Sequence, residues 1–289
     1  MLPQVALADV HQAASSIPVS DLLVLGVALL IAGAVVGFLA GLFGIGGGTV
    51  IVPVLYEAFG WFSVPDEVRM PLCIGTSLAV IIPTSISAFG THWKRGAVDI
   101  QILKAWLMPL IVGVLIGIAS AHYASSAAFK VAFVAIALMT AARLIWGDML
   151  PSFGSNLPRG AQMPGYGVAI GASSSLAGIG GGLVANMLMT MHGRSIQQAI
   201  ATSSGIGIVV AIPGALGYAI AGWQKTGLPP LSLGFVSLIG FLLLMPMSLV
   251  TAKVGAALVH RLPKALLERA FAAYLLAVSL RFIFSLAHN

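Results

Sequence analysis

The sequence predicts an all-α polytopic membrane protein, built from two inverted repeats of about four to five helical segments each. Its 289 residues are 59% hydrophobic and only 8% charged, whereas soluble domains average about 25% charged residues. A chain with so few charges cannot cover a water-facing surface. The phrase Gly-Ile-Gly-Gly-Gly also occurs twice, at residues 44–48 and 178–182. Because three glycines in a row disfavour a helix, the helices are expected to break at both motifs.

Apolar stretches of the length needed to span a bilayer, about 20 residues, follow one another along the chain. We expect membrane segments at roughly 21–43, 71–92, 103–122 and 127–146, and then at roughly 164–179, 196–221, 232–259 and 265–286. Two shorter apolar runs, at about 47–60 and 181–192, directly follow the triple glycines. The sequence leaves open whether these runs are separate crossings, giving ten passes, or parts of re-entrant pairs, giving six crossings plus hairpins.

The two halves of the chain resemble each other beyond the glycine phrase. Gly37, Leu42 and Val50 correspond to Gly171, Leu176 and Val184, and Thr76-Ser77 corresponds to Thr202-Ser203. We therefore divide the chain into an N-terminal transmembrane repeat (1–150), a linker (151–163) and a C-terminal transmembrane repeat (164–289). The linker is marked by prolines, glycines and serines.

The positive charges predict the orientation, because cytoplasmic loops of membrane proteins carry an excess of Lys and Arg. With five passes per half and the N-terminus outside, most cations fall on the cytoplasmic side: Lys94, Arg95, Lys104, Arg143, Arg159, Arg194, Lys253, Arg261, Lys264 and Arg269. The others, Arg69, Lys130, Lys225 and Arg281, fall outside. An odd number of passes makes the two repeats antiparallel. We expect a multi-pass protein of the inner membrane with an external N-terminus.

The two glycine breaks predict a solute site near the middle of the membrane. A helix broken there persists only where it is buried in protein or lines a polar cavity, and paired breaks in two repeats are typical of transporters. A helix that restarts after glycines presents free N–H groups and the positive end of its dipole. Two such N-termini facing each other would form a cradle for a small anion.

The sequence around the first glycine motif resembles that of the TauE/SafE sulfite exporter family. The resemblance lies in residues 37–53 (GFLAGLFGIGGGTVIVP), in residues 74–78 (IGTSL) and in residues 92–99 (HWKRGAVD). It implies an inner-membrane carrier for small sulfur-containing anions such as sulfite, thiosulfate or organosulfonates, often working outward. The second copy departs from the pattern, because Met187 stands where Pro53 would repeat and Asn186 lies beside it.

The candidate substrate-binding residues are the motif glycines and the hydroxyl and amide side chains near them. They are Gly46, Gly47, Gly48, Thr49, Thr76, Ser77, Gly180, Gly181, Gly182, Asn186, Thr202 and Ser203. Two other readings stay open. The triple glycines can serve close helix packing, as expected for Gly33, Gly37, Gly41, Gly113 and Gly117, and the hydroxyls can bond to their own helix backbone.

The sequence favours a secondary transporter working by alternating access, and we predict no enzyme activity, cofactor or metal. It contains no paired carboxylates, His-x-x-x-His or phosphate loop, and one cysteine, Cys73, excludes a disulfide within the chain. The expected partners are the anion and the lipid bilayer, and no nucleic acid. A homo-oligomer, a carrier for small carboxylates or other anions, and a passive anion channel remain open.

Overall fold

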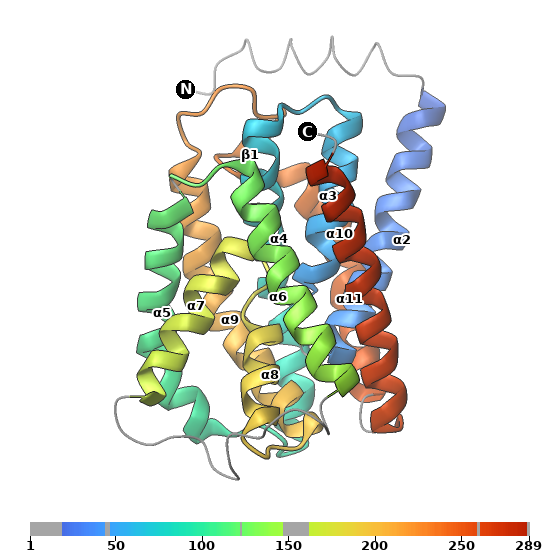
Figure 1. Cartoon of the computed structure of the whole chain (residues 1–289). Coiled ribbons are helices and arrows are strands. Elements are labelled where there is room, and N and C mark those ends of the chain that lie inside the picture. The colour runs from blue at the N-terminus through green and yellow to red at the C-terminus, as the bar shows by residue number, and fades with distance from the viewer. Residues whose placement is uncertain (1–18, 44–46, 122, 147–161, 259–260, 288–289) are drawn as a thin grey trace.

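A computed structural model describes residues 19–43, 47–121, 123–146, 162–258 and 261–287 (Figure 1). These residues form ten helices and one short strand pair. The first half contains α2 (Val19–Phe43), α3 (Gly48–Trp61), α4 (Asp66–Lys94), α5 (Ile100–Ala121) and α6 (Ser126–Trp146). The second half contains α7 (Gln162–Ala177), α8 (Gly182–Met191), α9 (Ile196–Ala221), α10 (Leu238–Leu258) and α11 (Lys264–Ala287), with strands β1 (Ser232–Leu233) and β2 (Val236–Ser237) before α10.

The bundle has two ends, which we call upper and lower as in Figure 1. At the upper end α3 passes into α4, and at the lower end α8 passes into α9. The helix α2 lies along α10, α7 lies along α5, α4 packs on α9, and α6 packs on α11. Each of these pairs joins one half of the chain to the other, so the two halves form one bundle.

Glycines bring the paired helices into backbone contact. A Cβ atom on Gly37 would lie 2.4 Å from the Cα atom of Ser248 in α10, and one on Gly113 would lie 2.2 Å from the carbonyl oxygen of Val168 in α7. Such distances require glycine, and they confirm that these glycines serve close helix packing.

The short helices α3 and α8 turn back toward the ends from which α2 and α7 come. Along α2 the contacts with α10 descend from Gly33 beside Leu244 to Gly41 beside Ala252, so α2 runs from the upper toward the lower end. The helix α3 then returns to the upper end (Figure 1). In the same way α7 rises beside α5 and α8 returns to the lower end. The chain therefore forms two helical hairpins, α2–α3 and α7–α8, that enter from opposite ends.

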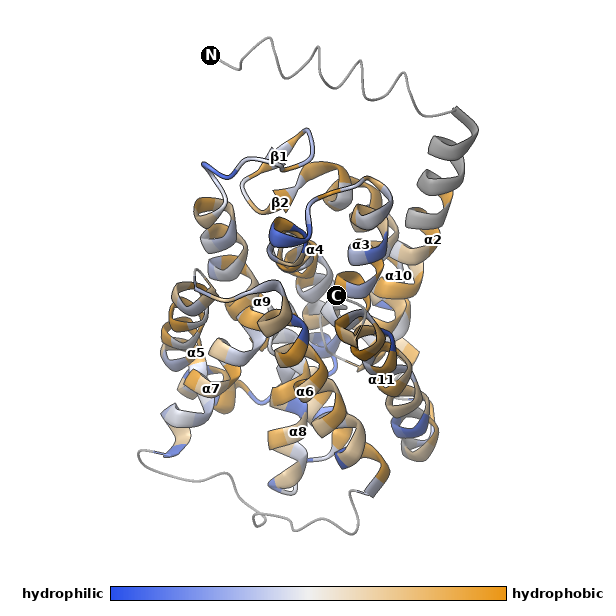
Figure 2. Ribbon diagram, turned by 45° about the horizontal axis from the view of Figure 1, so that its top comes forward, coloured by the Kyte–Doolittle hydropathy of each residue, from blue (hydrophilic) through white to orange (hydrophobic). Residues whose placement is uncertain are grey.

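Six described helices, α4, α5, α6, α9, α10 and the Glu268–Ala287 part of α11, are long and apolar enough to cross a membrane. Hydrophobic residues cover the lengths of these helices in Figure 2. Exposed tryptophans lie toward both ends, for example Trp223 after α9 and Trp93 in the last turn of α4, as in membrane interfaces. The described residues thus contain six candidate crossings and two helical hairpins.

The expected segment 232–259 is wrong at its beginning. Residues 232–237 form the β1–β2 pair, with Gly234 in the turn at φ +54°, and α10 starts only at Leu238. The Ser237 hydroxyl accepts a hydrogen bond from the Gly240 amide (3.2 Å) and so begins the helix. Most of the predicted linker, up to residue 161, lies outside the described residues.

Candidate substrate-binding site

The helices break at both glycine motifs, as the sequence predicts. Gly47 is the N-cap of α3 and Gly181 is the N-cap of α8, each with φ of +81°. This left-handed conformation is costly for residues with a Cβ atom, so glycine allows each helix to restart inside the bundle. Gly46 lies outside the described residues.

The tips of the two hairpins touch each other. A Cβ atom on Gly48, the first residue of α3, would lie 2.2 Å from the carbonyl oxygen of Gly178 and 2.7 Å from the Cα atom of Ile179. The Ser77 hydroxyl of α4 donates a 2.9 Å hydrogen bond to the same Gly178 carbonyl. The structure therefore brings Gly48, Ser77 and the second glycine motif together at the centre of the protein.

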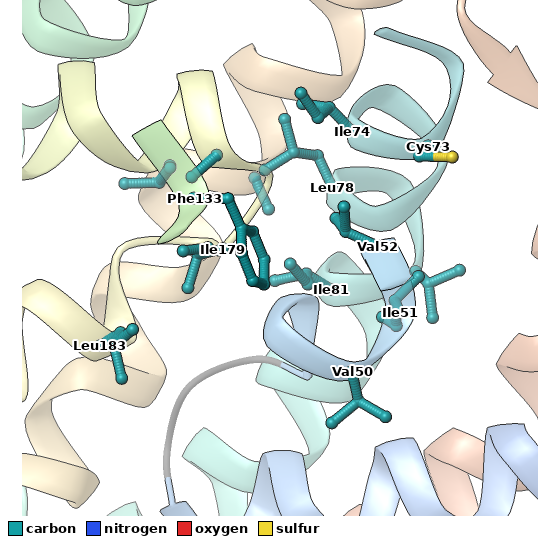
Figure 3. Close-up of a cluster of buried hydrophobic side chains, with 14 of the residues drawn as sticks. Val50, Ile51, Val52, Cys73, Ile74, Leu78, Ile81, Phe133, Ile179 and Leu183 are labelled. Carbon is teal, nitrogen blue, oxygen red and sulfur yellow. The ribbon is translucent and has the colours of Figure 1, made fainter. Parts of the chain in front are cut away.

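Apolar side chains fill the region around these tips. Gly180 packs against Ile81 of α4, and Gly182 is buried as the first residue of α8. Figure 3 shows Ile81, Ile179 and Phe133 of α6 clustered there, and all three are fully buried. The centre is closed in this structure, rather than an open polar cradle.

Thr76 and Thr202 occupy equivalent positions in the two halves and make equivalent contacts. The Thr76 hydroxyl accepts a 2.9 Å hydrogen bond from the amide of Ser237, just before α10. The Thr202 hydroxyl accepts a 2.9 Å hydrogen bond from the amide of Asp99, just before α5. Each threonine thus ties a central helix of one half to a helix start of the other, a role that the sequence did not suggest.

The remaining predicted residues are buried and differ in their contacts. Asn186 donates a 2.7 Å hydrogen bond from Nδ2 to the carbonyl of Phe43, the last residue of α2, and Ser203 bonds to a carbonyl of its own helix. The Tyr274 hydroxyl donates to the carbonyl of Thr49 (2.8 Å). Within the described residues, the Thr49 hydroxyl and the Asn186 Oδ1 atom have no hydrogen-bond partner.

Two further hydroxyls near the tips were missed by the sequence analysis. Ser85 of α4 lies beside Gly207 of α9, where an added Cβ atom would be 2.6 Å from its hydroxyl, and Ser174 is buried in the last turn of α7. Neither hydroxyl has a hydrogen-bond partner within the described part of the chain. Ser85 follows Ser77 by two helical turns on one face of α4, and this spacing could have indicated it.

Cavities lie on either side of the closed centre. A cavity of about 310 Å³ at the upper end is lined by residues of α4, α5 and α9, among them Glu67, Lys225 and Tyr218. The Tyr218 hydroxyl donates a 3.1 Å hydrogen bond to the carbonyl of Ser175 near the end of α7. Tyr218 thus joins the wall of this cavity to α7.

A second cavity of about 30 Å³ lies on the lower side, beside α8. It is lined by Leu183, Asn186 and Thr190 of α8 and by Arg143 and Glu268 near the lower ends of α6 and α11. The two cavities therefore lie toward opposite ends of the bundle.

The cations are distributed unequally between the two ends. Among the described residues, those in or beside the lower helix ends are Lys94, Arg95, Lys104, Arg143, Arg194, Lys253, Arg261, Lys264 and Arg269. Those toward the upper end are Arg69, Lys130, Lys225 and Arg281. Lys130 is 1% exposed, with its ammonium 3.1 Å from the Ser285 hydroxyl and 4.7 Å from the centre of the Tyr56 ring.

The six candidate crossings and the two helical hairpins among the described residues identify a multi-pass membrane protein of α-helical type. Comparison with known proteins agrees and identifies it more closely. The chain belongs to the sulfite exporter TauE/SafE family, whose profile matches residues 29–282. The chain is similar to a probable membrane transporter protein of Haemophilus influenzae, at 32% identity over 252 residues, which are 87% of this chain and 95% of that protein.

A probable membrane transporter protein of Methanocaldococcus jannaschii is 29% identical over 194 residues, 67% of this chain and 72% of that protein. No solved structure gives a significant match. Family and relatives together make the protein a membrane transporter.

Proposed function

We propose that this protein is a secondary transporter that exports small sulfur-containing anions, such as sulfite, thiosulfate or organosulfonates, by alternating access. The observation that carries the proposal is the start of α3 and α8 at the centre of the bundle. Within the described structure neither helix has a side-chain cap, whereas α9 is capped by Ser195 and α5 by Asp99. Uncapped helix N-termini offer N–H groups and a positive dipole to an anion.

The buried hydroxyls support an oxyanion as the substrate. Thr49 and Ser85 lie around the hairpin tips, and within the described structure their hydroxyls have no partner, so each can donate one hydrogen bond to a sulfonyl or sulfite oxygen. The Ser77 hydroxyl donates to Gly178 while the tips touch and would become available only when they separate. The class of sulfur-containing anion itself rests on the family. In a site without a full positive charge, an anion is held by dipoles and hydrogen bonds, which favours release as well as binding.

Inversion of the two halves is supported by their packing. The contact of α2 with α10 has its counterpart in that of α7 with α5, and the contact of Thr76 with Ser237 has its counterpart in that of Thr202 with Asp99. Exchanging the halves therefore reproduces the same set of contacts, with the hairpins entering from opposite ends. Inverted repeats of this kind place a central site between two alternately closed pathways.

Alternating access is supported by the closed centre and by the cavities on both sides of it. On the proposed path, the buried residues Ile81, Ile179 and Phe133 would lie between the upper and the lower cavity. Their contacts would then have to separate for an anion to pass. This arrangement favours a carrier over an open channel.

The distribution of cations supports a cytoplasmic lower end. Positive residues near helix ends are retained on the cytoplasmic side, and the lower end carries most of them. The N-terminus, which precedes α2, then lies outside the cell membrane. The larger cavity then opens on the external side of the inner membrane.

Counterflow in proteoliposomes tests the proposal. Purified protein is reconstituted, the vesicles are loaded with unlabelled sulfite, thiosulfate, a short organosulfonate or a carboxylate, and uptake of the labelled counterpart is followed. We expect saturable counterflow with at least one sulfur anion and weaker counterflow with the carboxylate. Flux that never saturates would indicate a channel, and stronger counterflow with the carboxylate would overturn the substrate class.

A further inference from the structure

The start of α5 at the lower end is held by four contacts that involve Asp99. Its Oδ1 atom accepts hydrogen bonds from the amides of Gln101 and Ile102, both 3.2 Å, and so caps the helix. Its own amide donates to Thr202 of α9. Its Oδ2 atom lies 3.5 Å from Nη2 of Arg194, which is in the turn between α8 and α9.

The guanidinium of Arg194 is incompletely paired. Its side chain is 36% exposed, but its Nε atom is buried and, within the described structure, has no hydrogen-bond partner. Its distance of 3.5 Å to Asp99 is long for a charge-assisted hydrogen bond, which is normally about 2.7–2.9 Å. Leaving a buried donor of a charged group without a partner is unfavourable. Arg194 is therefore poised to accept a better partner.

The position of Arg194 links this group to the returning arm of a hairpin. Its backbone amide donates a 3.1 Å hydrogen bond to the carbonyl of Met189 in the last turn of α8. The other end of α8 is the glycine tip at the centre. A ligand that binds Arg194 would therefore affect both the α7–α8 hairpin and the start of α5.

The equivalent contact at the upper end has no charge. Ser237 takes the place of Asp99 there, with its amide bonded to Thr76 and its hydroxyl capping α10. The two helix starts are held alike by hydrogen bonds, and the ion pair is added at the lower end. The ion pair thus lies at the lower end, which is the end where the proposed export would take up its substrate.

We infer that Arg194 is the entry residue for the transported oxyanion, and that the incoming anion replaces Asp99 on its guanidinium. The Nε and Nη2 groups form a fork that matches two oxygens of a sulfite or sulfonate group. Binding of the anion would supply the missing partner of Nε and release Asp99 from Arg194, which loosens the lower end around α5, α8 and α9. This inference rests on the proposed function.

Uptake of labelled sulfite into inside-out membrane vesicles, whose exposed face is cytoplasmic, tests the inference. Three variants are compared with the wild type. Arg194→Lys keeps the charge and loses the fork, Asp99→Asn removes the ion pair and keeps a residue that caps helices equally well, and Arg261→Lys is a matched control at an exposed position of the same end. Thermal unfolding of each variant is measured alongside.

We expect Arg194→Lys to raise the KM about tenfold, the loss typical of a bidentate contact, with Arg261→Lys unchanged. Asp99→Asn should lower the KM, because the anion no longer competes with a carboxylate. An unchanged KM in Arg194→Lys, or a raised KM in Asp99→Asn, overturns the inference while leaving the proposed function standing. If the wild type shows saturable uptake of none of the sulfur anions, the proposed function is overturned, and the inference with it.

Discussion

Replacing Gly48 by alanine tests whether the two hairpin tips are in contact. The backbone of Gly48 is helical and accepts alanine, but its new Cβ atom would lie 2.2 Å from the Gly178 carbonyl oxygen. Real contacts of this kind are at least 3.0 Å, so the tips must move apart. Both sides of the contact are backbone, and a side-chain rotation cannot relieve it.

The expected cost follows from these contacts. Forcing a methyl group into a packed interior costs about 1–3 kcal/mol, and losing the Ser77 hydrogen bond to Gly178 would add about 0.5–1.5 kcal/mol. Alanine regains up to about 1 kcal/mol of helix propensity. We therefore expect Gly48→Ala to lower the free energy of unfolding by about 0.5–3.5 kcal/mol and to impair transport.

A thiol-reactive fluorophore gives a direct assay in detergent. Cys73 is the one cysteine of the chain and is fully buried, so it should react only as the protein unfolds. The matched control is Gly90→Ala in α4, where a Cβ atom meets no described atom within 4 Å, and it should be neutral or stabilising. If Gly48→Ala unfolds at the same temperature as Gly90→Ala, the proposed contact between the tips is refuted.

Three further substitutions test individual hydrogen bonds. Ser77→Ala should lower the free energy of unfolding by about 1 kcal/mol or more, as measured by denaturation. Ser204→Ala loses only a hydrogen bond within its own helix and should lower the free energy of unfolding less. Thr202→Val should lower the free energy of unfolding by about 1 kcal/mol, whereas Thr202→Ser should not. Equal melting temperatures for the two variants would contradict the role of the Thr202 hydroxyl in holding the start of α5. Tyr274→Phe removes the 2.8 Å bond to the Thr49 carbonyl and should speed amide exchange at the start of α3, and unchanged exchange would count against it.

The sequence predicted the features that depend on one stretch of chain. Three glycines inside an apolar run indicate a helix break wherever the run lies, and both breaks are found with Gly47 and Gly181 in left-handed conformations. Apolar length indicated long membrane segments that include the six candidate crossings, and the spacing of small residues indicated that Gly37 serves close helix packing. These predictions needed no knowledge of which helices are neighbours.

The sequence could not predict what depends on contacts between the halves. The sequence indicates Thr76 and Thr202 as candidate substrate ligands because they are polar and lie in apolar helices. It does not indicate their hydrogen-bond partners in the structure, the amides of Ser237 and Asp99, which are far away in sequence. Likewise the apolar contact at the hairpin tips includes Phe133 from α6, a residue that no motif marks. These contacts depend on how the helices of the two halves pack against each other.

In the proposed mechanism an anion would remove an energetic cost of the closed centre. Within the described structure, the hydroxyls of Thr49, Ser85 and Ser174 are buried without partners, and each such group costs about 1–3 kcal/mol. Burial of Ile81, Ile179 and Phe133 near the hairpin tips offsets part of this cost. When the tips separate, the apolar contact is lost, and an oxyanion can receive hydrogen bonds from the hydroxyls and from the starts of α3 and α8. The balance between these two sets of contacts would let the substrate itself promote opening, because it stabilises the open arrangement and leaves the closed one unchanged.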